Sequence, residues 1–196
     1  MEWLDIAGKR QVTAACLSRA DWAAVVAAQP TYDLAGVAFL DAALYGETAP
    51  EPQQEPDPTY APRLAAAQLL ATGASWYEAA VWCNALSAEL GLAAAYLLNN
   101  SPAKWVPAII EVRSKRTQAE LDLAPGTKGV RLLVDAERQA AARVAGFTAI
   151  QGIHEWGGDR RRAPFIFESA VFSGSNSPLC NGMFKLPWNA FRVVRG

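Results

Sequence analysis

Few side chains in this sequence could carry out metal or nucleophilic chemistry. His154 is the only histidine, and the three cysteines, Cys16, Cys83 and Cys180, stand far apart. One imidazole excludes metal centres that need two or three histidines, and the cysteine spacing offers no CxxC pair for zinc or for dithiol exchange. No Ser or Cys nucleophile motif accompanies His154, which we expect to be a hydrogen-bonded structural residue. The residues therefore predict no catalytic set, no metal site and no cofactor.

The composition indicates one globular domain spanning residues 1–196. The chain has 196 residues, 52% of them hydrophobic, which is enough for a sizeable core. Its 18 Lys and Arg balance 19 Asp and Glu without a long basic run, so we expect no nucleic-acid partner. We find no apolar signal segment at the N-terminus and no apolar stretch long enough for a membrane span. These features favour a cytoplasmic or phage-associated protein and leave its oligomeric state open.

Three helices stand out along the chain. The first is expected at residues 19–28, where Ser18 and Asp21 form a capping-box pair. The second begins after Ser75, which pairs with Glu78, and ends near Gly91, with one buried stripe that includes Leu90. A short strand or turn and then a third helix at residues 135–144, closed by Gly146, follow further along. Between the first two helices, residues 46–62 hold five prolines and are predicted to form an extended surface loop.

The C-terminal quarter differs in composition from the rest. Residues 151–196 hold 3 alanines against 13 in each of the first two blocks of fifty, and five of the seven phenylalanines. Residues 165–174 ("FIFESAVFSG") and 190–196 ("AFRVVRG") are typical of short strands. We expect Trp188 and Phe191, like Trp76 and Trp82 of the second helix, to lie in the core. The run of three arginines at 160–162 is most simply a solvated turn, and it could also bind an acidic group of a ligand.

Five segments of the chain resemble the formylglycine-generating-enzyme type of C-type lectin fold. Residues 75–96 read "SWYEAAVWCNALSAELGLAAAY", and residues 129–146 read "GVRLLVDAERQAAARVAG". The motifs "GIHEW" at 152–156 and "AFRVVRG" at 190–196 are similar to two further family segments, and residues 12–28 are similar to the family's entry helix. The resemblance implies an α+β fold in which helices surround short twisted antiparallel strands.

The enzymes of this family depend on ligands that the chain lacks. The formylglycine-generating enzymes hold copper on two closely spaced C-terminal cysteines, whereas only Cys180 lies in that region. The related sulfoxide synthases need a three-histidine iron site, and His154 is alone. The resemblance therefore implies a protein that is not an enzyme. The alternative is a divergent enzyme of the formylglycine-generating type, in which Cys180 or His154 still serves chemistry.

The variable proteins of diversity-generating retroelements are a third branch of this fold. Their C-terminal segment is rewritten at adenines of AAC-type codons and displays the resulting side chains as a hypervariable ligand-binding surface. The resemblance implies that the corresponding diversified segment here is 162–196, and that its partner is a protein or other macromolecular ligand. Within it, Glu168, Met183, Lys185 and Trp188 are types that such changes do not produce, and they are expected to be fixed. The expected ligand-binding residues are Phe165, Ile166, Phe167, Ser169, Phe172, Ser173, Ser175, Asn176, Ser177, Leu179, Cys180, Asn181 and Phe184.

Phenylalanines interleaved with Ser, Gly and Asn have the composition of an adaptive binding surface. We therefore expect several of Phe165, Phe167, Phe172 and Phe184 to be accessible to solvent. Two other interpretations stay open. The protein could be an undiversified phage or surface binding protein, or the motifs "EPQQEPDP" (51–58) and "WNA" (188–190) could form a weak calcium-dependent sugar site.

Overall fold

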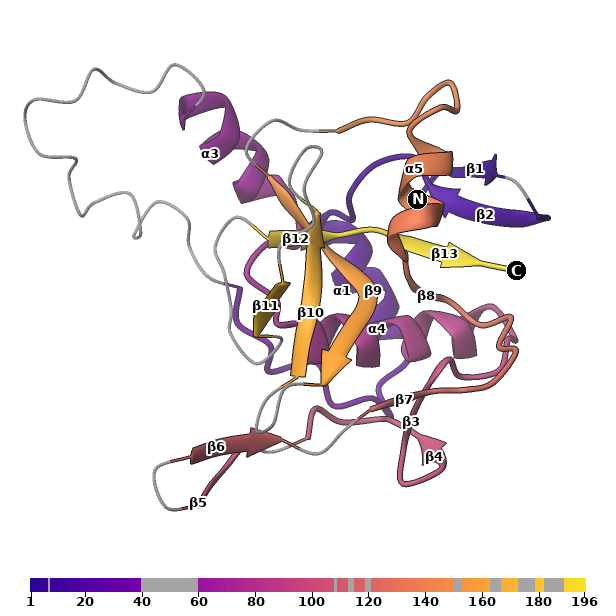
Figure 1. The fold of residues 1–196 in the computed structure, drawn as a ribbon. Helices are drawn as coiled ribbons and strands as arrows, with labels where there is room; N and C mark the ends of the chain where they lie inside the picture. Colours follow the sequence, from indigo (N-terminus) through magenta and orange to yellow (C-terminus); the bar gives the residue numbers. More distant parts are fainter. Residues whose placement is uncertain are drawn as a thin grey trace, which may run out of the picture.

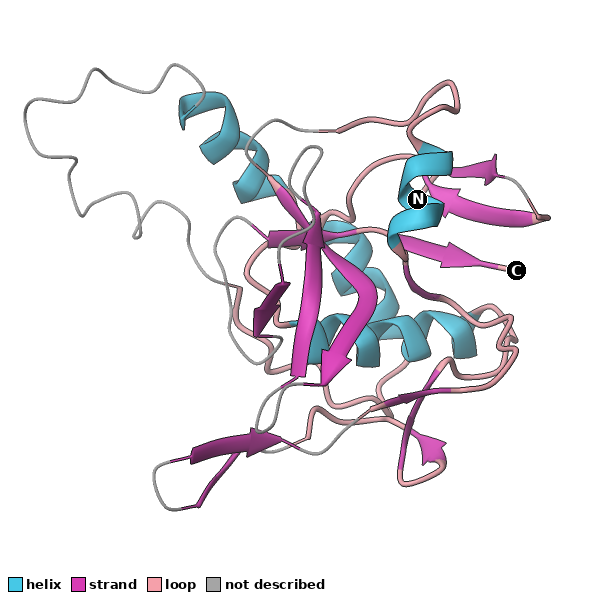
Figure 2. Ribbon diagram, viewed as in Figure 1, coloured by secondary structure: helices cyan, strands magenta, loops and turns pink. Residues whose placement is uncertain are grey.

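The computed structural model consists of four helices and a set of small sheets among the residues that it describes (Figure 1; Figure 2). The helices are α1 (Arg19–Ala28), α3 (Tyr60–Leu69), α4 (Trp76–Glu89) and α5 (Asp135–Ala141). None of the helices in the described part is long and apolar enough to span a bilayer. The described residues are 1–6, 8–39, 60–107, 109–112, 115–118, 121–149, 153–162, 167–172, 179–181 and 189–196.

Capping residues fix where α1 and α4 begin, as the sequence predicted. The Asp21 amide donates to Ser18 Oγ at 3.0 Å, and the Ser18 amide donates back to the Asp21 carboxylate at 3.0 Å. At α4 the Glu78 amide donates to Ser75 Oγ at 3.2 Å, and the Ser75 amide donates to Glu78 Oε2 at 2.7 Å. Each reciprocal pair satisfies amides that the first helical turn leaves free. After α4 the chain turns at Gly91, whose φ of +69° suits glycine.

The central helix is more deeply buried than its predicted single stripe. Every residue from Trp76 to Ser87 is buried, because α1, β3 and β8 pack around α4 and small alanines let them approach. Leu90 was predicted to belong to the stripe, but it lies beyond the helix end and is 39% exposed. The prediction failed there because the packed elements cover α4 only as far as its last turn.

Two other expectations about local structure need correction. Helix α3 starts at Tyr60, so residues 60–62 of the predicted loop 46–62 are helical; Pro62 is tolerated because first-turn amides need no partner within the helix. The rest of that loop lies outside the described residues. Helix α5 ends at Ala141 rather than 144 and is followed by turns that lead to Gly146 at φ +89°. The first helix, expected at residues 19–28, is confirmed with those bounds.

One four-stranded sheet joins the two ends of the chain. It runs in the order β1 (Trp3–Ile6), β2 (Arg10–Thr13), β13 (Val193–Arg195) and β8 (Arg131–Leu132), and every pair is antiparallel. Val12 of β2 pairs with Val194 of β13. The N-terminal and C-terminal strands therefore lie side by side (Figure 1).

The second four-stranded sheet contains most of the C-terminal region. Its order is β11 (Leu179–Asn181), β10 (Phe167–Phe172), β9 (His154–Arg162) and β12 (Asn189–Phe191). Pairing is antiparallel except between β9 and β12, which are parallel. The predicted C-terminal strands are confirmed where the structure describes them, at 167–172 in the first region and at 190–191 and 193–195 in the second. Two smaller sheets complete the described strands: β3 (Tyr96–Leu98), β4 (Ser101–Pro102) and β7 (Asp122–Leu123) form one, and β5 (Ile109–Val112) and β6 (Lys115–Gln118) form the other.

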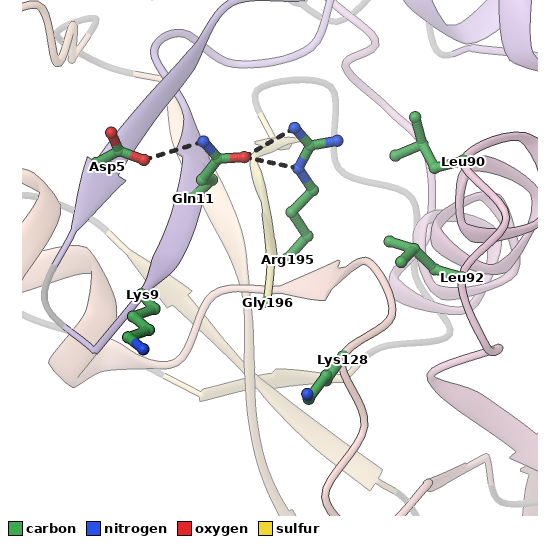
Figure 3. Close-up of a pocket in the computed structure, with 8 residues that line it drawn as sticks. All are labelled: Asp5, Lys9, Gln11, Leu90, Leu92, Lys128, Arg195 and Gly196. Carbon is green, nitrogen blue, oxygen red and sulfur yellow. Dashed lines mark hydrogen bonds between the residues drawn. The ribbon is translucent and has the colours of Figure 1, made fainter.

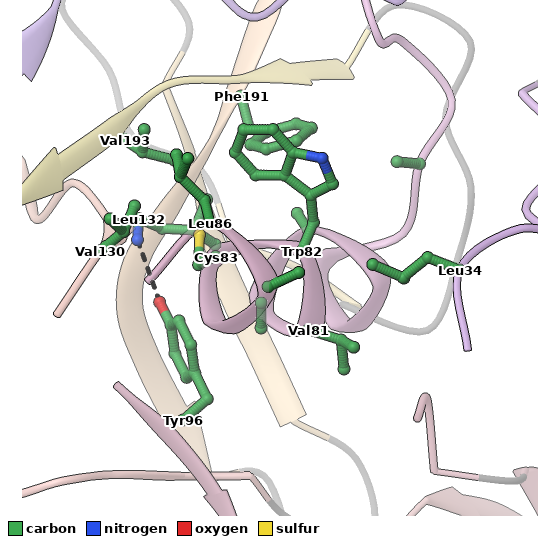
Figure 4. Packing of buried hydrophobic residues seen from close by; sticks show 14 of the residues in the cluster. Leu34, Val81, Trp82, Cys83, Leu86, Tyr96, Val130, Leu132, Phe191 and Val193 are labelled. Atoms are coloured by element: carbon green, nitrogen blue, oxygen red, sulfur yellow. Dashed lines mark hydrogen bonds between the residues drawn. The ribbon is translucent and has the colours of Figure 1, made fainter. Parts of the chain in front are cut away.

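The core centres on aromatic rings carried by three elements. Trp82 of α4 stacks on Trp22 of α1 with ring centroids 5.9 Å apart, and Phe191 of β12 meets both edge-on. Figure 4 shows Phe191 against Trp82, with Tyr96 on another side of α4. The predicted burial of Trp76, Trp82 and Phe191 is confirmed, while Trp188 lies outside the described residues. The chain is therefore a mixed α+β protein in which α4 is enclosed by sheets and by α1.

Candidate ligand-binding face

The second sheet brings six of the thirteen predicted ligand-binding residues onto two neighbouring strands. Phe167, Ser169 and Phe172 belong to β10, and Leu179, Cys180 and Asn181 make up β11. The backbone register pairs Ser169 with Cys180. Residues that are ten or more positions apart in sequence thus become neighbours at the edge of this sheet, which we call the β9–β12 sheet.

The other seven predicted residues lie outside the described part of the chain. They are therefore neither brought together nor separated by the structure, and the expected exposure of the four phenylalanines stays a prediction. These seven residues are Phe165, Ile166, Ser173, Ser175, Asn176, Ser177 and Phe184.

The arginines at 160–162 do not form the predicted turn. They are the last three residues of β9 and pair with β10, Arg160 opposite Ser169 and Arg162 opposite Phe167. The backbone of β10 supplies their ladder partners, which is why the segment is extended. Residues 160–162 were not among the ligand-binding residues expected from the sequence, yet they lie on β9, which is paired with β10.

The first half of β9 is fixed to the core by two indole groups. Trp156 Nε1 donates to the carbonyl oxygen of Ala74 at 2.8 Å, and Trp76 Nε1 donates to the carbonyl oxygen of Gly157 at 2.9 Å. Both rings are buried, so each hydrogen bond is shielded from water. Val171 of β10 pairs with Trp156, which attaches the end of β10 to the same anchor.

A bulge separates this anchored half of β9 from its arginine half. Between the pairs Ser169–Arg160 and Val171–Trp156, one residue of β10 lies opposite three of β9. Gly158 sits in the bulge, and its amide donates to the carbonyl oxygen of Leu133 at 2.6 Å. A Cβ at position 158 would lie 2.8 Å from the carbonyl oxygen of Leu132. Only glycine therefore allows β9 to pass this close to β8.

A buried ion pair joins Glu155 of β9 to Arg192, the residue that follows β12. Arg192 is 1% exposed, and its Nε and Nη2 donate to the two carboxylate oxygens of Glu155 at 3.2 and 3.1 Å. Its Nη1 donates to the carbonyl oxygen of Ala14 at 2.5 Å, and Nη2 also donates to that of Thr148. The guanidinium carbon lies 4.0 Å from the ring centroid of Phe147. Both charged residues occur in motifs singled out from the sequence, but nothing in the sequence signalled that they pair.

Cys16 and Cys83 are unsuited to nucleophilic or redox work. Cys16 and Cys83 are free and buried, and burial raises the pKa of each thiol far above its ordinary value. The carboxylate of Glu155 raises the pKa of Cys16 further. Both thiols therefore stay protonated at neutral pH.

No metal-ligating cluster of His, Cys, Asp or Glu occurs within the described ranges. The backbone of His154 pairs with that of Asn189. Of the calcium-like motifs, residues 51–58 lie outside the described part, and Ala190 is a buried residue of β12. The described arrangement is thus that of an α+β scaffold carrying an anchored sheet, whose β10 and β11 hold the predicted binding positions.

Comparison with known proteins identifies this scaffold. No family model matches the chain, and no curated protein matches it in sequence. In structure the chain is similar to CarF, with a TM-score of 0.66 and 16% identity over 95% of this chain and 85% of CarF. It is also similar to Treponema denticola variable protein 1, with a TM-score of 0.57 and 15% identity over 95% of this chain and 84% of that one. The expectation that the chain shares its fold with a variable protein is confirmed.

Proposed function

We propose that this chain is a non-catalytic ligand-binding protein, a single domain over residues 1–196 with the C-type lectin fold of the formylglycine-generating type. Its C-terminal segment, residues 162–196, is diversified by a retroelement and forms the recognition surface. The observation that carries the proposal is the shared fold with Treponema denticola variable protein 1 across nearly the whole chain. Since a fold alone does not set a function, the residues of the β9–β12 sheet must agree with it.

In that sheet the residues that anchor β9 precede the proposed diversified segment, whereas the predicted binding positions lie within it. Glu155 and Trp156, which anchor β9, are types that adenine changes in AAC-type codons do not produce. The six predicted binding residues on β10 and β11 are all types that such changes do produce. A diversified protein needs this separation, because random replacement of an anchor would unfold the scaffold.

The chemistry of the segment favours a macromolecular ligand. Phenylalanine supplies apolar contact area, while Ser and Asn supply hydrogen bonds that adapt to different partners. The proposed ligand-binding residues are those between Phe165 and Phe184 that were predicted from the sequence. Their partner is a protein or another macromolecule with a surface that these side chains can cover.

Sequencing the DNA beside this gene tests the proposal directly. We expect a near-copy of the codons for residues 162–196, next to a reverse-transcriptase gene, that differs from the coding copy only where the template has adenine. A copy with differences spread over all four bases, or the absence of any copy, would contradict diversification. In that case the C-terminal segment is a fixed feature of the protein.

A further inference from the structure

A cavity lies away from the β9–β12 sheet, where the N-terminal and C-terminal strands meet the end of α4. It measures about 600 Å³, within the size range of small-molecule pockets. Its walls come from the β1–β2 hairpin, the end of β13, the turn after α4 and the loop before β8 (Figure 3). The lining residues are Asp5, Lys9, Gln11, Leu90, Leu92, Lys128, Arg195 and Gly196.

A chain of hydrogen bonds holds Arg195 in place in this cavity. Its Nε and Nη2 donate to Gln11 Oε1 at 3.0 and 2.7 Å, and Gln11 Nε2 donates in turn to Asp5 Oδ1 at 2.9 Å. The guanidinium carbon also lies 4.2 Å from the ring centroid of Trp3. Gln11 and Trp3 fix the guanidinium without neutralising it, so its charge is available to a ligand.

The side chains that line the cavity carry an excess of positive charge. Lys9, Lys128 and Arg195 supply three cations, against the single side-chain carboxylate of Asp5. Within the part of the chain that the structure describes, none of these three cations forms a salt bridge with a carboxylate. A ligand that enters the cavity therefore meets a net positive field.

The remaining wall of the cavity is aliphatic. Leu90 and Leu92 lie on one side of Arg195, with Gln11 and Asp5 on the other (Figure 3). Leu90 is one of the few large hydrophobic side chains that the described part of the protein exposes. Binding an aliphatic group would remove this surface from water.

We propose that this cavity binds a small aliphatic carboxylate, with the carboxylate at Arg195 and Lys128 and the hydrocarbon chain against Leu90 and Leu92. The cavity size favours a free small molecule over a folded partner. The cavity contains none of the proposed ligand-binding residues between Phe165 and Phe184, although Arg195 and Gly196 belong to the segment 162–196. The experiment below measures octanoate binding by this chain, so its outcome does not depend on whether that segment is diversified.

Isothermal titration of the intact protein with octanoate tests this site. We expect saturable binding of one octanoate per chain, whereas octanol, which lacks the charge, and inorganic phosphate, which lacks the chain, bind more weakly. The variant Lys128→Glu reverses a charge at an exposed position without removing a described hydrogen bond, so it is expected to fold. It should weaken octanoate binding on the order of tenfold.

The matched control is Arg143→Glu, which makes the same charge change on an exposed residue outside the cavity and should bind octanoate as the wild type does. A second variant, Leu92→Asp, places a negative charge on the aliphatic wall and should abolish binding. The proposal is overturned if octanoate does not bind, if octanol binds equally well, or if Lys128→Glu and Arg143→Glu have the same affinity.

Discussion

Trp76 and Trp156 hold helix α4 and strand β9 together through two reciprocal hydrogen bonds. The indole of Trp76 donates to the backbone beside Trp156, at Gly157, and the indole of Trp156 donates to the backbone just before Trp76, at Ala74. Each bond joins positions about eighty residues apart in sequence. This indole pair is the link by which the central helix sets the position of the proposed recognition sheet.

Replacing Trp156 with phenylalanine should therefore weaken the scaffold. The change leaves the buried Ala74 carbonyl without its donor and opens a small cavity, with an expected loss of about 2–4 kcal/mol in the free energy of unfolding. Urea unfolding followed by circular dichroism measures it. The matched control is Trp105→Phe at a side chain that is 55% exposed, where we expect a change within about 0.5 kcal/mol. Equal effects for the two variants would contradict the anchoring role.

Removing the charge of Arg192 should be more costly than removing an exposed arginine. In Arg192→Met the carboxylate of Glu155 stays buried without its partner, and we expect a loss of about 3–5 kcal/mol in stability. Arg143→Met, at an exposed position, serves as the control and should be nearly neutral.

A double variant separates the ion pair from the other contacts of Arg192. Glu155→Met combined with Arg192→Met removes both buried charges, so part of the lost stability should return. Recovery should be incomplete, because the carbonyl oxygens of Ala14 and Thr148 still lack their donor. A double variant no more stable than Arg192→Met would show that the unpaired carboxylate is not the source of the loss.

Glu137 should make stability depend on acid pH. Burial by itself raises its pKa, but hydrogen bonds from Arg131 and the Val134 amide and the charge of Arg10 outweigh that effect, so the pKa lies below the ordinary 4.5. A carboxyl with a lowered folded-state pKa contributes its full stability above about pH 4.5, and the contribution is lost as the pH falls through the folded-state pKa.

Comparing Glu137→Gln with the wild type over this acid range measures the effect. The variant should lose about 2–3 kcal/mol near neutral pH, where the hydrogen bonds to the charged carboxylate are intact in the wild type. The difference from the wild type should shrink below about pH 4.5. Glu89→Gln, at an exposed position, is the matched control. A difference that stays constant from neutral to acid pH would contradict the assignment.

The proposed recognition surface predicts one reactive thiol in the native protein. Cys16 and Cys83 are buried and stay protonated, so they should react slowly with Ellman's reagent. If Cys180 lies on a ligand-binding surface, it should react quickly, and Cys180→Ser should remove that fast phase. Cys83→Ser is the matched control and should keep it. A native protein without a fast-reacting thiol would contradict the exposure of Cys180.

The sequence was most informative where structure depends on neighbouring residues. The starts of α1 and α4 were predicted because Ser18 and Ser75 are each followed, three residues later, by the acidic residue that completes a capping box. The resemblance to a known family predicted the fold that the structural comparison found. Its motifs contain residues of the buried core, such as Trp76 of α4 and Phe191 of β12.

Relationships between distant residues could not be predicted in the same way. Three such relationships depend on strand register and on which strands become neighbours, and no local sequence pattern encodes either. They are the Glu155–Arg192 ion pair, the hydrogen bonds of Trp76 and Trp156, and the pairing of residues 160–162 with β10. Arg195 was likewise not recognised as part of a cavity, because its neighbours come from both ends of the chain. Sequence periodicity predicts which face is apolar, but it does not predict which distant residue covers that face.

Gly158 provides a last test of how the β9–β12 sheet is held. In Gly158→Ala the new Cβ would lie 2.8 Å from the Leu132 carbonyl oxygen, and because that atom belongs to the backbone, β8 and β9 must move apart. The movement would stretch the hydrogen bond from the Gly158 amide to Leu133, so we expect a loss of about 1–3 kcal/mol in the free energy of unfolding.

The matched control is Gly36→Ala, at a glycine with open space around its Cβ position and no left-handed backbone, where stability should change little. Urea unfolding measures both variants. If the bulge at Gly158 positions the recognition sheet, ligand affinity should fall in Gly158→Ala even at temperatures where the variant is fully folded, because β10 is paired with β9 on both sides of the bulge. A Gly158→Ala protein as stable as Gly36→Ala would show that β9 does not need this close approach to β8.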